Sequence, residues 1–104
     1  MKRILHVEDS ERWRRNVQRK LGATYDLKQV ETIPEAKAEE ESFDIYIIDG
    51  RIVGEDGIQY ATELFEAGKN VVIFSAEQYH GKAPYINKAG GSSPLVEKVL
   101  ELLP

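Results

Sequence analysis

Phe43-Asp44-Ile45-Tyr46-Ile47-Ile48-Asp49-Gly50 carries the strongest structural signal in the chain. A short, almost wholly apolar run of β-branched and aromatic residues predicts a central parallel strand that is buried on both faces. Asp49 then lies at the carboxyl end of this strand. In open α/β sheets ligands bind at that edge, because the strand ends and the loops that follow them form a crevice. The run therefore predicts a functional carboxylate at position 49.

Length and composition limit the classes of protein that the chain can be. Its 104 residues predict a single domain, residues 1–104, without a second, output-type domain. Charged residues make up 31% and hydrophobic residues 41%, which is typical of a soluble globular protein. The net charge of -4 argues against direct nucleic-acid binding. The lack of cysteine excludes disulfides and thiolate metal sites and favours the cytoplasm. The apolar run at residues 4–7 is too short for a signal peptide or for insertion into a membrane.

The remaining patterns predict alternating strands and helices. Strands are expected at residues 4–7, 24–30, 43–49, 71–74 and 85–87, and helices at residues 11–21, after the cap Thr32, from Asp56-Gly57, and after the cap Ser93. Only residues 77–84, with Gly81 and Pro84, join the last two strands, and a parallel crossover normally needs a dozen or more residues. The order predicts an α/β, flavodoxin-like, doubly wound five-stranded parallel sheet with strand order 2-1-3-4-5 and about four helices, in which a short loop replaces the last crossover helix.

Polar side chains follow four of the predicted strands. Glu8-Asp9, Asp49, Ser75 and Lys88 would converge, because the carboxyl ends of parallel strands meet at one edge of the sheet. Three carboxylates, a hydroxyl and an ammonium are suited to a divalent cation and a phosphoryl group, with Asp49 as a nucleophile that forms an aspartyl phosphate. For Asp9, a second interpretation is that it or Ser10 merely caps the following helix.

The helix predicted over residues 11–21 has one apolar stripe and basic residues elsewhere. Trp13, Val17 and Leu21 recur every four positions. The other faces carry one acid, Glu11, and five basic residues: Arg12, Arg14, Arg15, Arg19 and Lys20. These basic residues form either a solvated helix face or a docking surface for an acidic protein partner.

Taken together, these segments resemble a response-regulator receiver domain of the two-component, chemotaxis-regulator type. The resemblance runs along the whole chain and is carried by five segments: Ile4-Leu5-His6-Val7-Glu8-Asp9, the run that ends at Asp49, Asp56-Gly57, Val72-Ile73-Phe74-Ser75-Ala76 and Tyr85-Ile86-Asn87-Lys88. It implies a signalling phosphoprotein that catalyses its own phosphotransfer and autodephosphorylation but turns over no external substrate.

The resemblance assigns the acidic residues to phosphate transfer and magnesium binding. Asp49 would accept the phosphoryl group from a phosphohistidine. Asp9 and Asp49 would bind Mg²⁺ directly, together with the backbone carbonyl of Arg51, and Glu8 would bind it through water. The side chains of Arg51 and Glu77 flank the site, where the family places variable residues that set the lifetime of the aspartyl phosphate.

The resemblance also implies a switch. Ser75 would hydrogen-bond the phosphoryl group and Lys88 would pair with one of its oxygens. Tyr85 matches the family's switch aromatic, which swings inward as Ser75 moves. Ala76 is small, as the family requires for access of the phosphoryl donor.

The resemblance further implies two kinds of partner protein. A sensor histidine kinase or a histidine phosphotransfer protein would dock on the helix that carries Arg12, Arg15 and Arg19, and the output would be a phosphorelay or contact with a downstream protein. Two prolines of the family pattern are replaced, by Val53 and Ala89. Together with the short crossover, these departures leave a second hypothesis open, a receiver-fold interaction module that signals without phosphate.

The sequence argues against two other interpretations, a hydrolase and a phosphoacceptor histidine. An aspartate-nucleophile hydrolase needs an acid two residues after the nucleophile, and the chain has Arg51 there. His6 lies inside a predicted buried strand, which favours a packed core residue over a phosphoacceptor.

Overall fold

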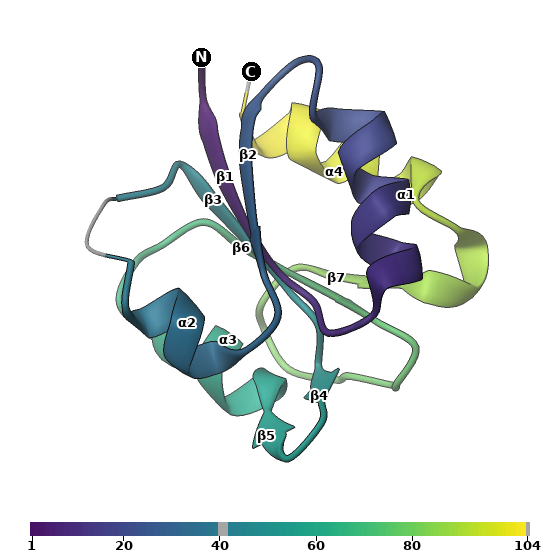
Figure 1. Ribbon diagram of the computed structural model, residues 1–104. Coiled ribbons are helices and arrows are strands. Elements are labelled where there is room, and N and C mark those ends of the chain that lie inside the picture. Colours follow the sequence, from purple (N-terminus) through teal and green to yellow (C-terminus); the bar gives the residue numbers. More distant parts are fainter. Residues whose placement is uncertain (40–41, 104) are drawn as a thin grey trace.

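A five-stranded parallel sheet forms the centre of the computed structural model, which describes residues 1–39 and 42–103 (Figure 1). The strands lie in the order β2-β1-β3-β6-β7 and all pair in parallel. Their bounds are β1 (Arg3–Val7), β2 (Asp26–Val30), β3 (Ile45–Ile48), β6 (Val71–Ser75) and β7 (Tyr85–Asn87). The predicted flavodoxin-like sheet and its strand order are confirmed, with β6 and β7 as the fourth and fifth strands of that order.

Helices cover both faces of the sheet. Their bounds are α1 (Glu11–Leu21), α2 (Ile33–Lys37), α3 (Gly57–Glu66) and α4 (Ser93–Leu102). Figure 1 shows α1 and α4 on one face, and α2 and α3 on the other. Two separate hydrophobic clusters fill the two layers between sheet and helices. The predicted reduction to about four helices is therefore confirmed.

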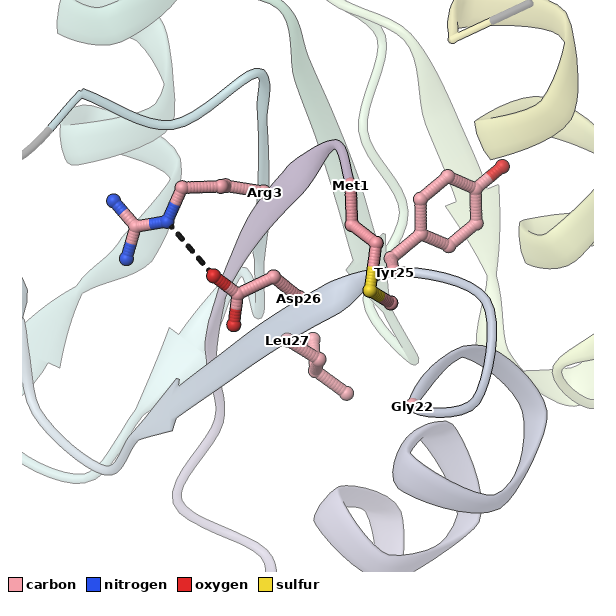
Figure 2. A pocket seen from close by; sticks show the side chains of 6 residues that line it. All are labelled: Met1, Arg3, Gly22, Tyr25, Asp26 and Leu27. Atoms are coloured by element: carbon pink, nitrogen blue, oxygen red, sulfur yellow. Dashed lines mark hydrogen bonds and ion pairs between the residues drawn. The ribbon is translucent and has the colours of Figure 1, made fainter.

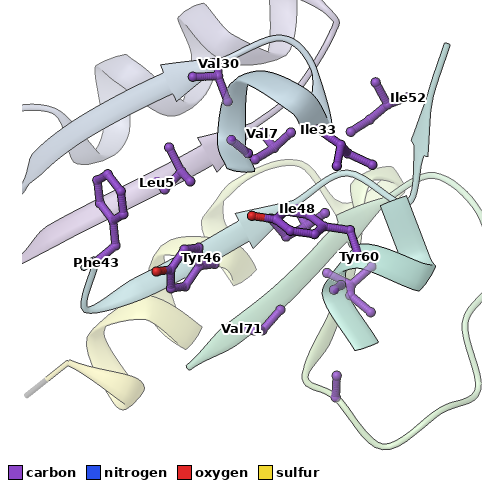
Figure 3. Close-up of a cluster of buried hydrophobic side chains, with 14 residues drawn as sticks. Leu5, Val7, Val30, Ile33, Phe43, Tyr46, Ile48, Ile52, Tyr60 and Val71 are labelled. Carbon is purple, nitrogen blue, oxygen red and sulfur yellow. The ribbon is translucent and has the colours of Figure 1, made fainter. Parts of the chain in front are cut away.

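The central strand β3 is buried along its whole length, which explains its unbroken apolar sequence. Ile45 and Ile47 face the layer of α1 and α4, whereas Tyr46 and Ile48 face α2 and α3. Figure 3 shows the layer between the sheet and helices α2 and α3, in which residues from β1, β3 and β6 contact residues from these two helices. Complete burial of one such aliphatic side chain stabilises the fold by roughly 1.5–3 kcal/mol.

Side-chain caps start three of the helices where the sequence places them. The Ser10 hydroxyl accepts a hydrogen bond from the backbone N–H of Trp13 (3.4 Å), and Asp56 accepts one from Gln59 (3.0 Å). Thr32 accepts the N–H of Glu35 (3.2 Å) and donates its hydroxyl proton to the carboxylate of the same residue (2.9 Å). Because Ser10 caps α1, the carboxylate of Asp9 is left for other contacts.

Several predicted boundaries were wrong. The loop expected after Asp49 contains a small antiparallel hairpin, β4 (Arg51–Ile52) and β5 (Glu55–Asp56), which turns at Gly54 with a φ of 74°. Residues 88–90, expected to be a strand tip and a flexible link, form the 3₁₀ turn η1 (Lys88–Gly90). The N-cap of α4 is Ser92 and not Ser93. The first two differences come from short-range contacts: Arg51 pairs with Asp56 in the hairpin, and the Asn87 side chain caps η1.

The crossover between β6 and β7 is a loop, as predicted. Residues 76–84, all of which the structure describes, contain no helix. The Tyr79 hydroxyl accepts the N–H of Ala83 (3.1 Å), and its ring lies 5.8 Å from the ring of Tyr85. A groove of about 410 Å³ lies between this loop and α3, and it is lined by Thr62, Phe65, Glu66, Tyr79, Gly81 and Lys82. The loop therefore leaves an open groove beside the sheet.

Another hollow lies away from Asp49. A cavity of about 500 Å³ is lined by residues near the amino ends of β1 and β2, where Arg3 forms an ion pair with Asp26 (3.0 Å; Figure 2). Across residues 1–39 and 42–103, no helix has the length and apolar character needed to cross a membrane.

Candidate functional site

Three carboxylates converge at the carboxyl edge of the sheet. Glu8 and Asp9 follow β1, and Asp49 follows β3. The Asp49 N–H donates to the carbonyl of Val7 (3.0 Å), which extends the pairing of β1 and β3 up to the acids. One carboxylate oxygen of each acid lies within 4.8 Å of the others. Glu8 is fully buried and Asp49 nearly so, whereas Asp9 is half-buried. The sheet thus brings together acids that are 40 residues apart in the chain.

Lys88 reaches into the same cluster from the end of β7, the edge strand next to β6. Its Nζ donates to Oε1 of Glu8 (2.6 Å) and lies 3.4 Å from Oδ2 of Asp49. The Lys88 side chain is only 8% exposed, so its charge is removed from water together with those of the acids. Asn87 helps to set its position, because the Asn87 side chain accepts the N–H of Ala89 (2.7 Å) and starts the turn η1.

The electrostatics of the cluster favour a cation. Burial and the neighbouring Asp49 raise the pKa of Glu8, although Lys88 acts in the opposite direction. Backbone N–H groups hold the acids in place: Ser10 donates to Glu8 (3.2 Å) and Val53 to Asp9 (3.0 Å). Carboxylate oxygens at this mutual distance are the hard ligands that Mg²⁺ prefers, so the donor set fits this ion.

Arg51 lies at the mouth of the cluster. Its backbone N–H donates to Oδ1 of Asp49 (3.3 Å), so this part of the backbone lies beside the expected nucleophile. Its side chain forms an ion pair with Glu77 (2.5 Å) that joins the hairpin to the segment after β6. Both side chains are substantially exposed, so the pair adds little to stability. The role of the Arg51 carbonyl as a metal ligand stays a prediction.

Ser75 and Tyr85 are joined through the backbone of the crossover loop. The buried Ser75 hydroxyl accepts the N–H of Glu77 (3.2 Å), and the Tyr85 hydroxyl donates to the Glu77 carbonyl (2.5 Å). Asn87 donates to the same Tyr85 hydroxyl (2.8 Å). A side chain at Gly50 would meet the Ser75 hydroxyl at 2.9 Å, so the glycine allows Ser75 to lie against the backbone next to Asp49.

Other predicted site residues lie at the surface. Ala76 is exposed directly after Ser75. On α1, Arg12, Arg15 and Arg19 are exposed, and Arg15 forms an ion pair with Glu11 (2.9 Å).

Arg14 does not belong to this exposed set. It donates to the backbone carbonyl of Glu8 (2.8 Å) and forms an ion pair with Glu31 (3.0 Å). The basic residues of α1 therefore divide into an exposed group and one that supports the site.

His6 is a fully buried residue of β1, which confirms its placement in the core. Burial lowers its pKa from 6.5 to about 3, and the charges of Lys88 and Arg14 act in the same direction. The side-chain amide of Gln29 donates a hydrogen bond from Nε2 to Nδ1 of His6 (3.0 Å). Only an unprotonated Nδ1 can accept this bond, which agrees with a neutral imidazole.

Sequence reasoning missed the aromatic side of the site. The rings of Trp13 and Phe74 lie 5.2 and 5.7 Å from Nζ of Lys88, measured to the ring centroids. The apolar stripe placed Trp13 in the core, but it is only half-buried. The sequence did hold a clue: Trp13 lies in the first turn of the helix that begins just after Glu8-Asp9, which places its ring near these acids.

No protein-family model and no curated protein matches the chain. Solved structures do match, and they are response-regulator receiver domains. Response regulator DrrB of Thermotoga maritima has a TM-score of 0.88 at 19% identity, over 99% of this chain and 52% of that one. Response regulator TrrA of the same organism, in complex with Mg²⁺-BeF, has a TM-score of 0.86 at 24% identity, over 98% of this chain and 99% of that one.

TrrA also matches in its complex with the histidine kinase ThkA, with a TM-score of 0.84 at 28% identity over 100% of both chains. The chain thus spans about half of DrrB and all or nearly all of TrrA. It has the receiver fold of response regulators, as the sequence resemblance implies.

Proposed function

We propose that this chain is a receiver that accepts a phosphoryl group from a phosphohistidine on Asp49, with Mg²⁺, and then signals or relays the group through protein contacts. One observation carries the proposal. Carboxylate oxygens of Glu8, Asp9 and Asp49 lie within 4.8 Å of one another, and the Lys88 ammonium contacts Glu8 and Asp49. These acids and the ammonium, with the Ser75 hydroxyl against the backbone of Gly50, meet the needs of phosphoryl transfer, which depends on positioning and charge stabilisation.

The transfer exchanges one bond to phosphorus for another. An oxygen of Asp49 attacks the phosphorus, the P–N bond to the donor imidazole breaks, and the imidazole leaves with its electron pair and takes a proton from solvent. The Arg51 N–H orients the Asp49 carboxylate. Lys88 offers an ammonium to the phosphoryl oxygens, and Ser75, which only accepts a bond from Glu77, can donate its hydroxyl proton.

Glu8, Asp9 and Asp49 would hold the Mg²⁺ ion. When bound, the ion offsets the negative charge of the carboxylates and of the phosphoryl oxygens. Two of these acids are buried, so the same charge would be costly without a cation.

In this proposal the protein does not turn over an external substrate. Arg51 stands where an aspartate-nucleophile hydrolase needs its general acid, and its guanidinium is engaged by Glu77. We expect Arg51, Glu77 and the small Ala76 to set the access of water and donors to the acyl phosphate.

The phosphoryl donor would be a sensor histidine kinase or a histidine phosphotransfer protein in the cytoplasm. The complex of TrrA with a histidine kinase supports this kind of partner. The exposed Arg12, Arg15 and Arg19 lie on α1, whose first turn adjoins the acids, so a partner with an acidic surface could dock there beside Asp49.

Phosphorylation by a small donor tests the proposal directly. The protein is incubated with acetyl phosphate or phosphoramidate and Mg²⁺, and its intact mass is measured. We expect a gain of one phosphoryl group that disappears in Asp49→Asn and without Mg²⁺, and that persists in Arg19→Ala. A wild-type protein that gains no mass would refute phosphotransfer to Asp49.

The groove beside the crossover loop favours one alternative, a receiver-fold module that binds a protein without phosphorylation. It is lined by Phe65, Tyr79 and Thr62 and is open in the described structure. If a binding partner is found, equal affinity for wild type and Asp49→Asn, with or without acetyl phosphate, would favour this alternative.

A further inference from the structure

Trp13 occupies a fixed position between α1 and the sheet. Its backbone N–H binds the capping hydroxyl of Ser10 (3.4 Å), which places the side chain in the first turn of the helix. Its ring meets the ring of Phe74 edge-on, with centroids 5.3 Å apart and planes at 88°. Phe74 is fully buried in β6, so one side of the Trp13 ring rests on a rigid part of the core.

These two rings form one wall of the space that holds the Lys88 ammonium. Nζ lies 5.2 Å from the centroid of Trp13 and 5.7 Å from that of Phe74. On its other side Nζ faces Glu8 (2.6 Å) and Asp49 (3.4 Å). A cation within about 6 Å of a ring centroid is attracted by the negative face of the ring, and the attraction strengthens where water is excluded. The low exposure of Lys88 meets that condition.

The two acids hold the charged end of Lys88, and the aromatic wall contacts it from the other side. A lysine carries its charge on a flexible four-carbon stem. This one follows a strand of three residues, and the next residue is Ala89, which restrains the backbone less than proline would. Glu8 and Asp49 also belong to the predicted ligand set for Mg²⁺, so the rings are the contacts of Lys88 that a bound metal would not take over.

We propose that Trp13 is a positioning residue, whose ring, supported by Phe74, orients the Lys88 ammonium toward the phosphoryl group that Asp49 receives. The inference rests on the proposed phosphotransfer for its consequence, but the contact itself is a property of the protein without phosphate. The position of Lys88 and the rate of phosphorylation can therefore be measured separately.

The contact is tested by NMR on the full chain. The ε-methylene protons of Lys88, assigned by their loss in Lys88→Met, should be shifted upfield by the ring current of Trp13. Trp13→Leu should move them toward the values of an exposed lysine, and Trp13→Phe should retain part of the shift. Phe65→Leu, an aromatic-to-leucine change on α3, is the matched control and should leave them unchanged. Lys88 signals that do not respond to Trp13→Leu overturn the proposal, whatever the phosphorylation assay gives.

The effect on phosphorylation is tested by a double-mutant cycle with acetyl phosphate, which loses acetate as Asp49 takes the phosphoryl group. Trp13→Leu should slow labelling by about 3- to 30-fold, the range expected for a desolvated cation–π contact. Trp13→Phe should slow it less. In the Lys88→Met background, Trp13→Leu should have no further effect, because the group that it positions is gone.

The outcomes separate the two claims. If wild type is not labelled, the proposed function fails. If wild type is labelled and Trp13→Leu slows labelling equally with and without Lys88, only the role of Trp13 is overturned. The amide spectrum of each variant checks its fold, and Trp13→Phe, which conserves a ring, provides the test if Trp13→Leu does not fold. As a further signature, Trp13 is the only tryptophan, so Lys88→Met should change the intrinsic fluorescence of the protein.

Discussion

Replacement of Gly57 by alanine tests how tightly α3 is packed against the candidate site. Gly57 is the first residue of α3, and a Cβ atom there would overlap the backbone carbonyl oxygen of Asp49 and lie 2.9 Å from its carbonyl carbon. Both obstacles are backbone atoms, so they cannot rotate away as a flexible side chain would. Either the amino end of α3 or the end of β3 must move.

The expected magnitude is the difference of two opposing effects. Overpacking a well-packed site costs about 1–3 kcal/mol. Alanine also favours the helix over glycine, by at most about 1 kcal/mol and by less at a helix end. We therefore expect Gly57→Ala to lower the free energy of unfolding by about 1–2 kcal/mol. For a domain of this size the melting temperature should fall by roughly 5–15 °C.

The assay is urea unfolding followed by far-UV circular dichroism, with an unchanged m-value as evidence that the unfolded state is the same. Gly90→Ala is the matched control, because its Cβ would find its nearest neighbour at 3.8 Å and its φ is not positive. That variant should stay within about 0.5 kcal/mol of wild type. If Gly57→Ala is as stable as wild type or more stable, helix propensity alone accounts for the change in the free energy of unfolding. The close approach of Gly57 to the Asp49 carbonyl is then refuted.

Three further predictions follow from the charged and buried groups. Lys88→Met should destabilise the protein by about 1–3 kcal/mol in urea unfolding without Mg²⁺, because the buried carboxyl groups of Glu8 and Asp49 lose their ammonium partner. Burial already raises the pKa of Glu8, so this residue takes up a proton in the variant, which limits the loss; a loss below about 1 kcal/mol would contradict this. The fold lowers the pKa of His6 from 6.5 to about 3, so between these pH values the unfolded chain binds a proton that the folded protein does not. The free energy of unfolding is therefore unaffected by the titration of His6 above pH 6.5 and falls below it, by up to about 1.4 kcal/mol per pH unit, until about pH 3. His6→Gln should flatten this part of the pH profile of the free energy of unfolding, and parallel profiles would count against it. Arg14→Ala should lower the free energy of unfolding by about 1–3 kcal/mol, because it removes a charged, half-buried hydrogen bond to the Glu8 carbonyl. Arg12→Ala removes an exposed side chain and should change the free energy of unfolding by less than about 0.5 kcal/mol. Equal effects in thermal melts would mean that the two arginines have the same role.

The crossover loop is connected to Ser75 by hydrogen bonds. In many α/β folds a helix covers this part of the sheet. Here the Tyr79 ring lies tilted against the ring of Tyr85, with centroids 5.8 Å apart. The Tyr85 hydroxyl donates to the carbonyl of Glu77, and the N–H of Glu77 donates to the Ser75 hydroxyl. A movement of Ser75 would therefore reach the loop through two hydrogen bonds, without an intervening helix.

Much of the architecture could be predicted because it depends on neighbours in the chain. The apolar run of β3, the caps Thr32 and Asp56, and the shortness of residues 77–84 are local features, and each predicted its element. Parallel pairing then brings strand ends to one edge. The convergence of Asp9 and Asp49 could be inferred for that reason, without knowledge of any side-chain contact.

What the tertiary structure alone decided are the contacts between side chains that are far apart in the sequence. Glu8 and Lys88 are separated by 80 residues, and nothing local indicates that they meet at 2.6 Å or that the rings of Trp13 and Phe74 enclose the ammonium. The contacts of Arg14 with the Glu8 carbonyl and with Glu31 were equally hidden. Periodicity and capping act over a few residues, so they determine which elements form and which way they face. The distances and charges that make the edge of this sheet a site arise only when those elements are packed together.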